Sequence, residues 1–316
     1  ETQKCAQTEI GERIHIEQPW KVTREEPNVF LMDRAAYRID QEEWKEEEDI
    51  LKLDNLCRRR FGYPLKEEAG AQPWTIQAEE ACEHVLSLRL EIVSEIDTDV
   101  TLALERREET RIFVNGKEET GKSTGWYVDE SIETVPVSSL HKGTNTIELQ
   151  IPYGKKANVE SCYLLGEFGV EVAGKYKKIT APKDQIVFGD LTHQGLPFYG
   201  GNLTYHCHLH ATGKPMRLRA QYFSSPVLEV RIDGKEAGNI VFAPYEIDLS
   251  NLTEGDHELE LVAYGNRFAT FGQLHNCDKN YSWFASCSWR TKGDRYAEEY
   301  QMKDLGILVT PELLTE

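Results

Sequence analysis

Hydrophobic and polar residues alternate along many short segments of the chain, and turn residues separate these segments. This pattern is typical of strands with one buried face. Two segments, residues 111–118 and 228–236, each have the pattern of strand, turn and strand, with Asn115-Gly116 and Asp233-Gly234 at their turns. Both dipeptides favour a type I′ hairpin, because both central residues of that turn need a positive φ.

The two hairpins belong to a longer internal repeat. Residues 137–154 follow the first hairpin and residues 249–265 follow the second, and each stretch has a turn before an alternating strand. The first strand ends at Tyr153-Gly154 and the second at Tyr264-Gly265. An ordered series of matches at nearly constant offset predicts two copies of one all-β unit.

A polar stretch marked by Gly174 and Pro182 lies between the two copies. Such stretches are typical of domain boundaries, and a chain of 316 residues is long enough for two domains. The sequence therefore predicts a first β-sandwich over residues 1–178 and a second over residues 179–316.

The first unit has additional residues at its front. Residues 27–40 have the pattern of strands, and residues 47–61 that of an amphipathic helix that ends at Gly62. Turn signals recur every 8–12 residues, whereas the alternation of strands and helices that marks a Rossmann fold or a TIM barrel is absent. The predicted fold is all-β: two tandem jelly-roll sandwiches with one short helix near the N-terminus.

Composition narrows the range of partners. The net charge is −18 and the pI is about 5.0, which argues against nucleic acid and anionic membrane surfaces as partners. No apolar run approaches the roughly 20 residues that span a bilayer. The negative net charge and the lack of a long apolar run favour a soluble protein with neutral partners.

The seven cysteines are scattered, odd in number and without a C-x-x-C pair. This pattern predicts reduced, mostly buried thiols and argues against a disulfide framework or a structural zinc site. The chain begins at Glu1 without a signal-peptide pattern, so we expect a piece of a longer, cytoplasmic protein.

Common catalytic signatures are absent from the sequence, including the G-x-S-x-G elbow, the P-loop and H-E-x-x-H. The 54 Asp and Glu residues do not single out a catalytic pair. The acidic run at residues 42–49 is predicted to be a solvated face that places negative charge at a helix N-terminus.

Two segments could bind a metal ion. His206, His208 and His210 would share one face of a strand and could form a ligand set. The alternative places Leu203, Tyr205, Cys207 and Leu209 in the core and the histidines in water, and we favour it. Residues 96–99 fit a calcium loop or an ordinary turn. The prediction is therefore no cofactor, with structural calcium as the open alternative.

Carbohydrate sites combine aromatic rings, which pack on sugar C–H faces, with polar groups that bind hydroxyls. Residues 194–202 and 266–290 have this mixture. The candidate contacts are Tyr199, Arg267, His275, Trp283 and Trp289. For each ring the alternative is a place in the core of a sandwich.

Several phrases resemble the C-terminal regions of large bacterial glycoside hydrolases, in particular the α-L-rhamnosidase group with its family 2-type sugar-binding domains. The phrase at residues 158–170 (NVESCYLLGEFGV) is similar to "LEACYLLGDFGV" of those proteins. Residues 27–40, 195–205 and 300–308 resemble the same proteins. Relatives often carry an "RNLLGPHH"-like loop, which Arg267, Gly272 and His275 match only in kind.

The resemblance implies two galactose-binding-like jelly rolls that accompany a catalytic barrel in the same parent chain. The implied function is a non-catalytic, sugar-binding accessory region of an enzyme that acts on a plant or host glycan. Two alternatives remain open. The sandwiches could be a purely structural buttress or dimerisation unit, or the chain could itself be a β-sandwich enzyme that acts on polysaccharides.

Overall fold

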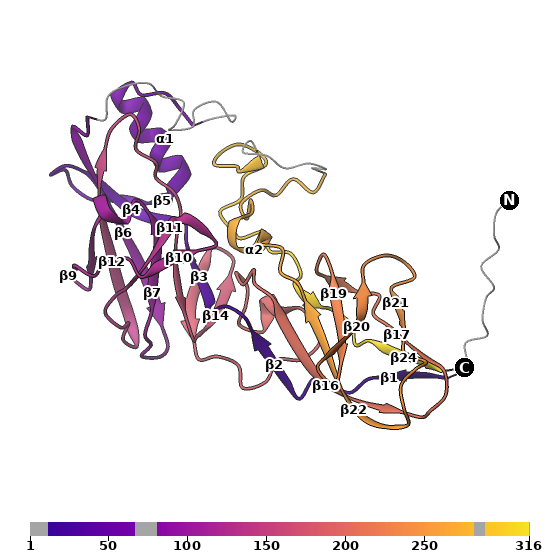
Figure 1. The fold of residues 1–316 in the computed structure, drawn as a ribbon. Helices are drawn as coiled ribbons and strands as arrows, with labels where there is room; N and C mark the ends of the chain where they lie inside the picture. Colours follow the sequence, from indigo (N-terminus) through magenta and orange to yellow (C-terminus); the bar gives the residue numbers. More distant parts are fainter. Residues whose placement is uncertain (1–11, 67–80, 281–287, 316) are drawn as a thin grey trace.

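The computed structural model describes residues 12–66, 81–280 and 288–315. In this part of the chain the structure is mostly β, with one helix of seven or more residues, which confirms the predicted all-β sandwich. Figure 1 shows two β lobes, one in indigo to rose and one in orange to yellow, joined side by side.

The first sandwich packs two sheets face to face. One sheet has the order β10 (Gly125–Tyr127), β11 (Asp129–Pro136), β7 (Thr101–Glu105), β13 (Cys162–Gly166) and β3 (Asn28–Met32). The other has the order β14 (Gly169–Ala173), β15 (Tyr176–Thr180), β6 (His84–Ser94), β12 (Gly143–Tyr153), β8 (Arg111–Val114) and β9 (Lys117–Glu119), with β4 (Arg34–Ile39) beside β6 and β5 (Lys45–Asp49) beside β4.

The second sandwich has the same plan with shorter strands. Its larger sheet has the order β2 (Lys21–Arg24), β16 (Leu203–Ala211), β22 (Gly255–Ala263), β19 (Leu228–Ile232) and β20 (Lys235–Ile240). The facing sheet has the order β1 (Arg13–His15), β24 (Glu312–Thr315), β17 (Met216–Arg219) and β21 (Glu246–Asp248), and β18 (Phe223–Ser224) pairs with β23 (Gly306–Ile307).

The strand order confirms the internal repeat. The series β6-β12-β8-β9 in the first sandwich corresponds to β16-β22-β19-β20 in the second. The two hairpins are also confirmed, because φ is positive at Asn115 (49°) and Gly116 (81°) and at Asp233 (51°) and Gly234 (73°). These values fit the type I′ turns that the dipeptides predict.

The Tyr-Gly pair that ends each repeated strand has a packing reason. A Cβ atom on Gly154 would lie 2.5 Å from the carbonyl oxygen of Ala81, and one on Gly265 would lie 1.9 Å from that of Gly200. Only glycine allows a second backbone segment to approach so closely. The glycine of each Tyr-Gly pair therefore marks a close contact between two backbone segments.

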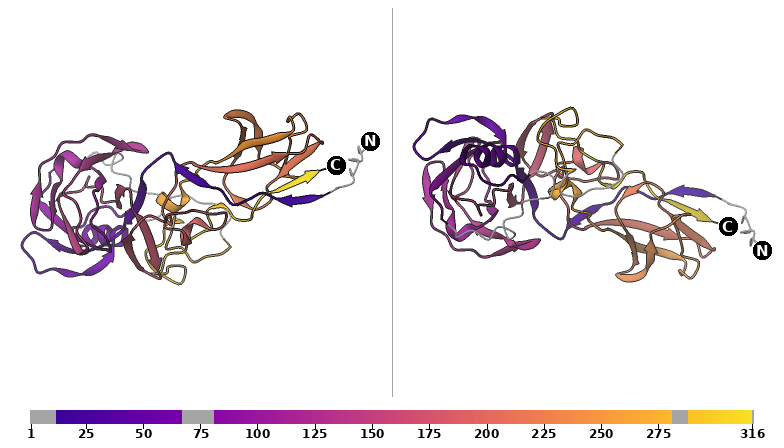
Figure 2. Two further views of the ribbon diagram at one scale, coloured as in Figure 1. Left: turned by 90° about the horizontal axis from the view of Figure 1, so that it is seen from below. Right: turned by 90° about the horizontal axis from the view of Figure 1, so that it is seen from above.

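The N-terminal strands of the chain belong to the second sandwich. Strands β1 and β2 precede the first sandwich in the sequence, yet β1 pairs with β24 and β2 pairs with β16 of the second sandwich. Both views in Figure 2 show these indigo strands beside the orange and yellow ones. The sandwich expected over residues 179–316 thus also contains strands from the range 1–178.

The helix α1 (Ile50–Phe61) begins later than the predicted residue 47, because Lys45–Asp49 forms strand β5. Asp49 caps the helix by accepting a hydrogen bond from the Lys52 amide, and Gly62 ends it with φ 68° as predicted. Arg58, in the last turn of the helix, is fully buried.

Residues 266–280 and 288–304 follow β22 in the sequence, and several of them pack on the first sandwich; we call them the bridging segment. Leu274 and Tyr300 belong to the hydrophobic core of the first sandwich, and Phe268 and Phe271 of the short helix α2 (Phe268–Phe271) pack against it. Phe198, which precedes β16, also belongs to the first core, whereas Ala269 of α2 belongs to the core of the second sandwich. The segment with the candidate sugar-binding residues therefore bridges the two sandwiches.

Five cysteines of the described residues are free thiols, and three of these are buried: Cys57, Cys162 and Cys207. Among the helices of the described ranges, none has the length and hydrophobicity needed to cross a membrane.

Candidate functional site

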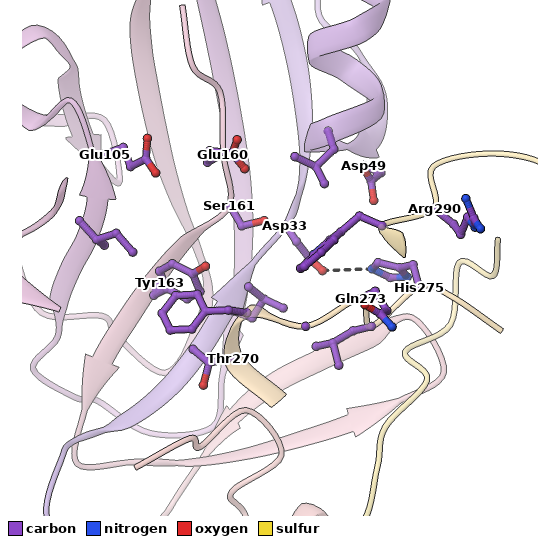
Figure 3. A pocket seen from close by; sticks show the side chains of 17 residues that line it. Asp33, Asp49, Glu105, Glu160, Ser161, Tyr163, Thr270, Gln273, His275 and Arg290 are labelled. Carbon is purple, nitrogen blue, oxygen red and sulfur yellow. Dashed lines mark hydrogen bonds and ion pairs between the residues drawn. The ribbon is translucent and has the colours of Figure 1, made fainter. Parts of the chain in front are cut away.

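A cavity of about 240 Å³ lies where the bridging segment meets the first sandwich. Figure 3 shows the side chains around it. The first sandwich contributes Leu31, Asp33, Asp49, Leu51, Glu105, Ile132, Glu160, Ser161 and Tyr163, and the bridging segment contributes residues 270–275, Trp289 and Arg290.

The acidic residues of the cavity lie at strand ends. Asp33 follows β3, Asp49 is the last residue of β5 and the N-cap of α1, and Glu105 is the last residue of β7. Glu160 lies just before β13. Strand ends of one sandwich converge at its rim, so carboxylates that are far apart in the sequence come to line one cavity.

A buried charge network forms one wall and joins the two sandwiches. Asp33 accepts hydrogen bonds from His275 Nε2 (3.1 Å), Lys177 Nζ (3.0 Å) and the Tyr300 hydroxyl (2.6 Å). His275 Nδ1 lies 2.9 Å from the carbonyl oxygen of Ala297. His275 and Tyr300 come from the bridging segment, and Asp33 and Lys177 from the first sandwich.

This network shifts the pKa of both titratable partners. Burial alone would raise the pKa of the Asp33 carboxyl, but the charge of Lys177 and the hydrogen bond and charge of His275 outweigh it and hold that pKa well below its usual value. Burial alone would lower the pKa of His275, but its hydrogen bond with Asp33 and the Asp33 charge raise it. The pair is therefore held as carboxylate and imidazolium.

Asp49 has the opposite shift. Its side chain is 4% exposed, and burial raises the pKa of its carboxyl to about 6 despite the hydrogen bond from the Lys52 amide. The negative charge of Asp33 adds to the increase. One cavity thus contains a carboxylate that stays ionised and a carboxyl that holds its proton into the mildly acidic range.

Gln273 borders the same cavity and is 2% exposed. Neither its amide oxygen nor its amide nitrogen has a hydrogen-bond partner among the described residues. A buried amide without partners costs about 1–3 kcal/mol, so such a group in a native structure requires an explanation.

Aromatic rings form a further part of the wall. Tyr163 and Phe271 meet edge to face with ring centroids 5.3 Å apart, and Tyr127 lies 5.9 Å from Tyr163. Trp289 and Arg290 line the cavity from the end of the bridging segment. Rings, carboxylates, an amide and a guanidinium thus surround one space, which can accept a ligand with apolar faces and several hydroxyl groups.

Of the sequence-predicted contacts, the structure brings His275 and Trp289 to the cavity. Trp283 lies outside the described residues. Tyr199, expected at the surface, is 3% exposed within the second core, and its hydroxyl donates to the Asn202 carbonyl oxygen (2.8 Å). Arg267 does not line the cavity; its guanidinium forms a bidentate ion pair with Glu26.

Sequence reasoning did not select Gln273, Asp33 or Asp49. Asp33 lies within the phrase at residues 27–40 that resembles glycoside hydrolases, which is the one local signal that pointed to it. The importance of the other two depends on burial and on distant neighbours.

The proposed calcium loop has another use in the structure. Asp97 Oδ1 accepts a hydrogen bond from the Lys142 amide (2.8 Å), and Asp99 Oδ1 accepts one from the Ser139 hydroxyl (2.5 Å). Both carboxylates thus hold the turn before β12 in place.

Comparison with known proteins gives no family. No protein-family model matches the sequence, and no curated protein matches it.

Solved structures align with the chain only loosely. A rhamnosidase from Novosphingobium sp. PP1Y has 12% identity over 75% of this chain and 23% of its own, with a TM-score of 0.30. An anti-sigma factor domain-containing protein from Clostridium clariflavum has 12% identity over 75% and 90%, with a TM-score of 0.24. A GH2 beta-galacturonidase from Eisenbergiella tayi has 11% identity over 80% and 37%, with a TM-score of 0.23.

The chain therefore spans 23% and 37% of the lengths of these two hydrolases.

Proposed function

We propose that the chain is a sugar-binding accessory region of a glycoside hydrolase, and that the cavity between the first sandwich and the bridging segment is its sugar site. Small-molecule pockets usually measure roughly 300–1000 Å³. At about 240 Å³ this cavity suits a ligand near the size of a single sugar ring.

The unpartnered amide of Gln273 is the observation that carries this proposal. A sugar hydroxyl both donates and accepts hydrogen bonds, so adjacent hydroxyls can pair with the oxygen and the nitrogen of one amide. When a sugar enters the cavity, rotation about the Gln273 side-chain bonds turns the amide toward it. Binding then supplies the two hydrogen bonds that the described structure lacks.

The remaining wall fits the same class of ligand. Trp289 offers a ring for the C–H face of a sugar, while Arg290 and Glu160 offer polar groups for hydroxyls. Asp33 and His275 are fixed by their mutual ion pair, so they form a rigid part of the wall. A preorganised wall lowers the entropic cost of binding.

The test is a glycan array followed by calorimetry with the full chain. We expect selective binding of one sugar class and a loss of about tenfold or more in affinity for Gln273→Leu. Gln301→Leu is the matched control, because the Gln301 amide donates to the Glu299 carbonyl oxygen on an exposed surface and does not line the cavity. If correctly folded protein bound no glycan on the array, the result would favour a purely structural role as a buttress.

One observation favours an enzyme as the second candidate. Asp33 and Asp49 line one cavity and have pKa values displaced in opposite directions, a pattern shared by acid–base pairs in catalysis. In this case the purified chain would hydrolyse aryl glycosides, and Asp49→Asn would remove turnover but keep sugar binding. If the chain bound sugar but did not hydrolyse aryl glycosides, the result would favour the accessory role.

A further inference from the structure

The outer face of the larger sheet of the second sandwich carries a ladder of histidines and carboxylates. The antiparallel register of β16 and β22 places His206 opposite Glu260, His208 opposite Glu258 and His210 opposite Asp256. The intervening residues Leu203, Tyr205, Cys207 and Leu209 are buried, as predicted for the alternating pattern. None of the ladder residues lines the cavity described above.

Three side chains converge at one end of this ladder. His206 Nδ1 lies 3.1 Å from Glu258 Oε1 and 3.5 Å from Glu260 Oε1. One ligand atom from each residue lies within 4.8 Å of the other two. Ligands of four-coordinate zinc, at 2.0–2.2 Å from the ion, are about 3.4 Å apart. The observed spacing is thus close to that of a coordinated set.

The imidazole of His206 is held in the orientation that such a set needs. Its Nε2 lies 3.3 Å from the Thr23 hydroxyl oxygen on β2. This oxygen can accept a hydrogen bond from Nε2–H, which leaves the Nδ1 lone pair facing the carboxylates. The Trp20 amide donates to the His206 carbonyl oxygen (2.9 Å), and the two rings lie 5.5 Å apart. Strand β2 and the preceding Trp20 therefore fix the orientation of the His206 ring.

The charge balance also favours a divalent cation. Two carboxylates facing one imidazole keep a net negative charge even when the imidazole is protonated. Arg231 stands opposite Glu260 on the neighbouring strand β19, but its Nε donates to Glu229 (2.5 Å). A divalent ion with a neutral imidazole would cancel both carboxylate charges.

We propose that His206, Glu258 and Glu260 bind a divalent cation of the zinc type. One imidazole and two carboxylates form a mixed nitrogen and oxygen set that suits zinc better than magnesium or calcium, which prefer oxygen ligands alone. Three protein ligands leave a fourth position for water or for His208, the next histidine on the same face.

Titration calorimetry of the full chain with ZnCl2 tests the site. We expect one zinc ion per chain, with affinity at least tenfold lower in His206→Ala and Glu260→Gln. Thr23→Val removes the group that orients the ring and should lower the affinity about tenfold. His210→Ala is the matched control, because His210 lies on the same face but pairs with Asp256 (2.7 Å).

Circular dichroism of each variant confirms folding, and the shift of the melting temperature with zinc gives a second readout, since a ligand bound only by the native state raises it. The proposal is overturned if zinc gives no saturable heat, if His206→Ala binds like the wild type, or if His210→Ala loses as much affinity. It is also overturned if MgCl2 binds as tightly as ZnCl2. If zinc gives no saturable heat, the ladder consists of cross-strand ion pairs only.

Discussion

At the scale of single residues, Gln273 and Gln194 differ in the hydrogen bonds of their side-chain amides. The Gln273 amide is unpartnered, whereas Gln194 accepts from the Val187 amide (2.8 Å) and donates to the Val187 carbonyl oxygen (3.1 Å). We expect Gln273→Leu to raise the free energy of unfolding by about 1–2 kcal/mol and Gln194→Leu to lower it by about 1–3 kcal/mol. Urea denaturation of both variants measures the difference; equal losses would show that the Gln273 amide is satisfied in solution.

Asp49 should make stability depend on pH. Because burial raises its pKa from 3.8 to about 6, the folded protein holds this proton more tightly than the unfolded chain. The resulting stabilisation is complete below pH 3.8 and is lost as the pH rises through about 6. The shift corresponds to about 3 kcal/mol.

Asp49→Asn removes this titration and keeps the helix cap, because asparagine caps helices as well as aspartate does. We expect the stability of the wild type to fall by about 3 kcal/mol relative to the variant between pH 4 and pH 7. Urea denaturation across this range provides the measurement. Parallel pH curves for the two proteins would contradict the assigned shift.

The sequence placed some site residues and not others for a physical reason. His275 and Trp289 were selectable because a loop rich in rings and polar groups is unusual in itself. The role of Gln273 depends on what surrounds it, and that environment comes from both sandwiches. Similarly, the sequence around the histidines of β16 does not reveal Glu258 and Glu260, because another strand supplies them.

At the scale of elements, helix α1 depends on a buried charge. Arg58 is fully buried and donates to Asp54 Oδ2 (3.1 Å) and to the carbonyl oxygens of Pro64 (3.0 Å) and Lys155 (3.2 Å). Removing one partner of a buried ion pair costs about 3–5 kcal/mol. We therefore expect Arg58→Ala to lower the free energy of unfolding by about that amount.

The matched control is Arg60→Ala on the same helix turn. Arg60 pairs with Glu42 at the surface, where water screens the two charges, so we expect Arg60→Ala to change the free energy of unfolding little. Thermal or urea unfolding of the two variants compares the positions directly. Similar small losses for both would mean that water reaches Arg58 in solution.

The elements themselves were predicted unevenly. The hairpins followed from Asn-Gly and Asp-Gly, because local turn chemistry determines their geometry. The start of α1 was not predicted correctly, because Lys45–Asp49 pairs with β4 and continues as a strand up to the N-cap of the helix. Pairing with a distant segment outweighed the local helical pattern there.

At the scale of the whole molecule, the second sandwich depends on residues that precede the first. Deleting residues 1–24 removes β1 and β2 and leaves the edges of β24 and β16 unpaired. We expect hydrogen exchange to accelerate at least tenfold in β16 and β24, while β6 and β12 of the first sandwich keep their protection.

The unchanged protection of β6 and β12 within the same protein serves as the internal control. If β16 and β24 kept their protection from hydrogen exchange after deletion of residues 1–24, their pairing with β1 and β2 would not stabilise the second sandwich. The sequence did not predict this arrangement, because three- and four-residue strands carry almost no periodic signal.

The crossing of the chain imposes an order on folding during synthesis. Strands β3 to β15 emerge as one continuous stretch, so the sheets of the first sandwich can pair early. Strand β1 must wait until its partner β24 has been made. During that interval β1 and β2 present open edges to which a matching segment of another chain could add. At high concentration, refolding should therefore yield dimers that exchange these N-terminal strands, whereas slow refolding of dilute protein should yield monomers.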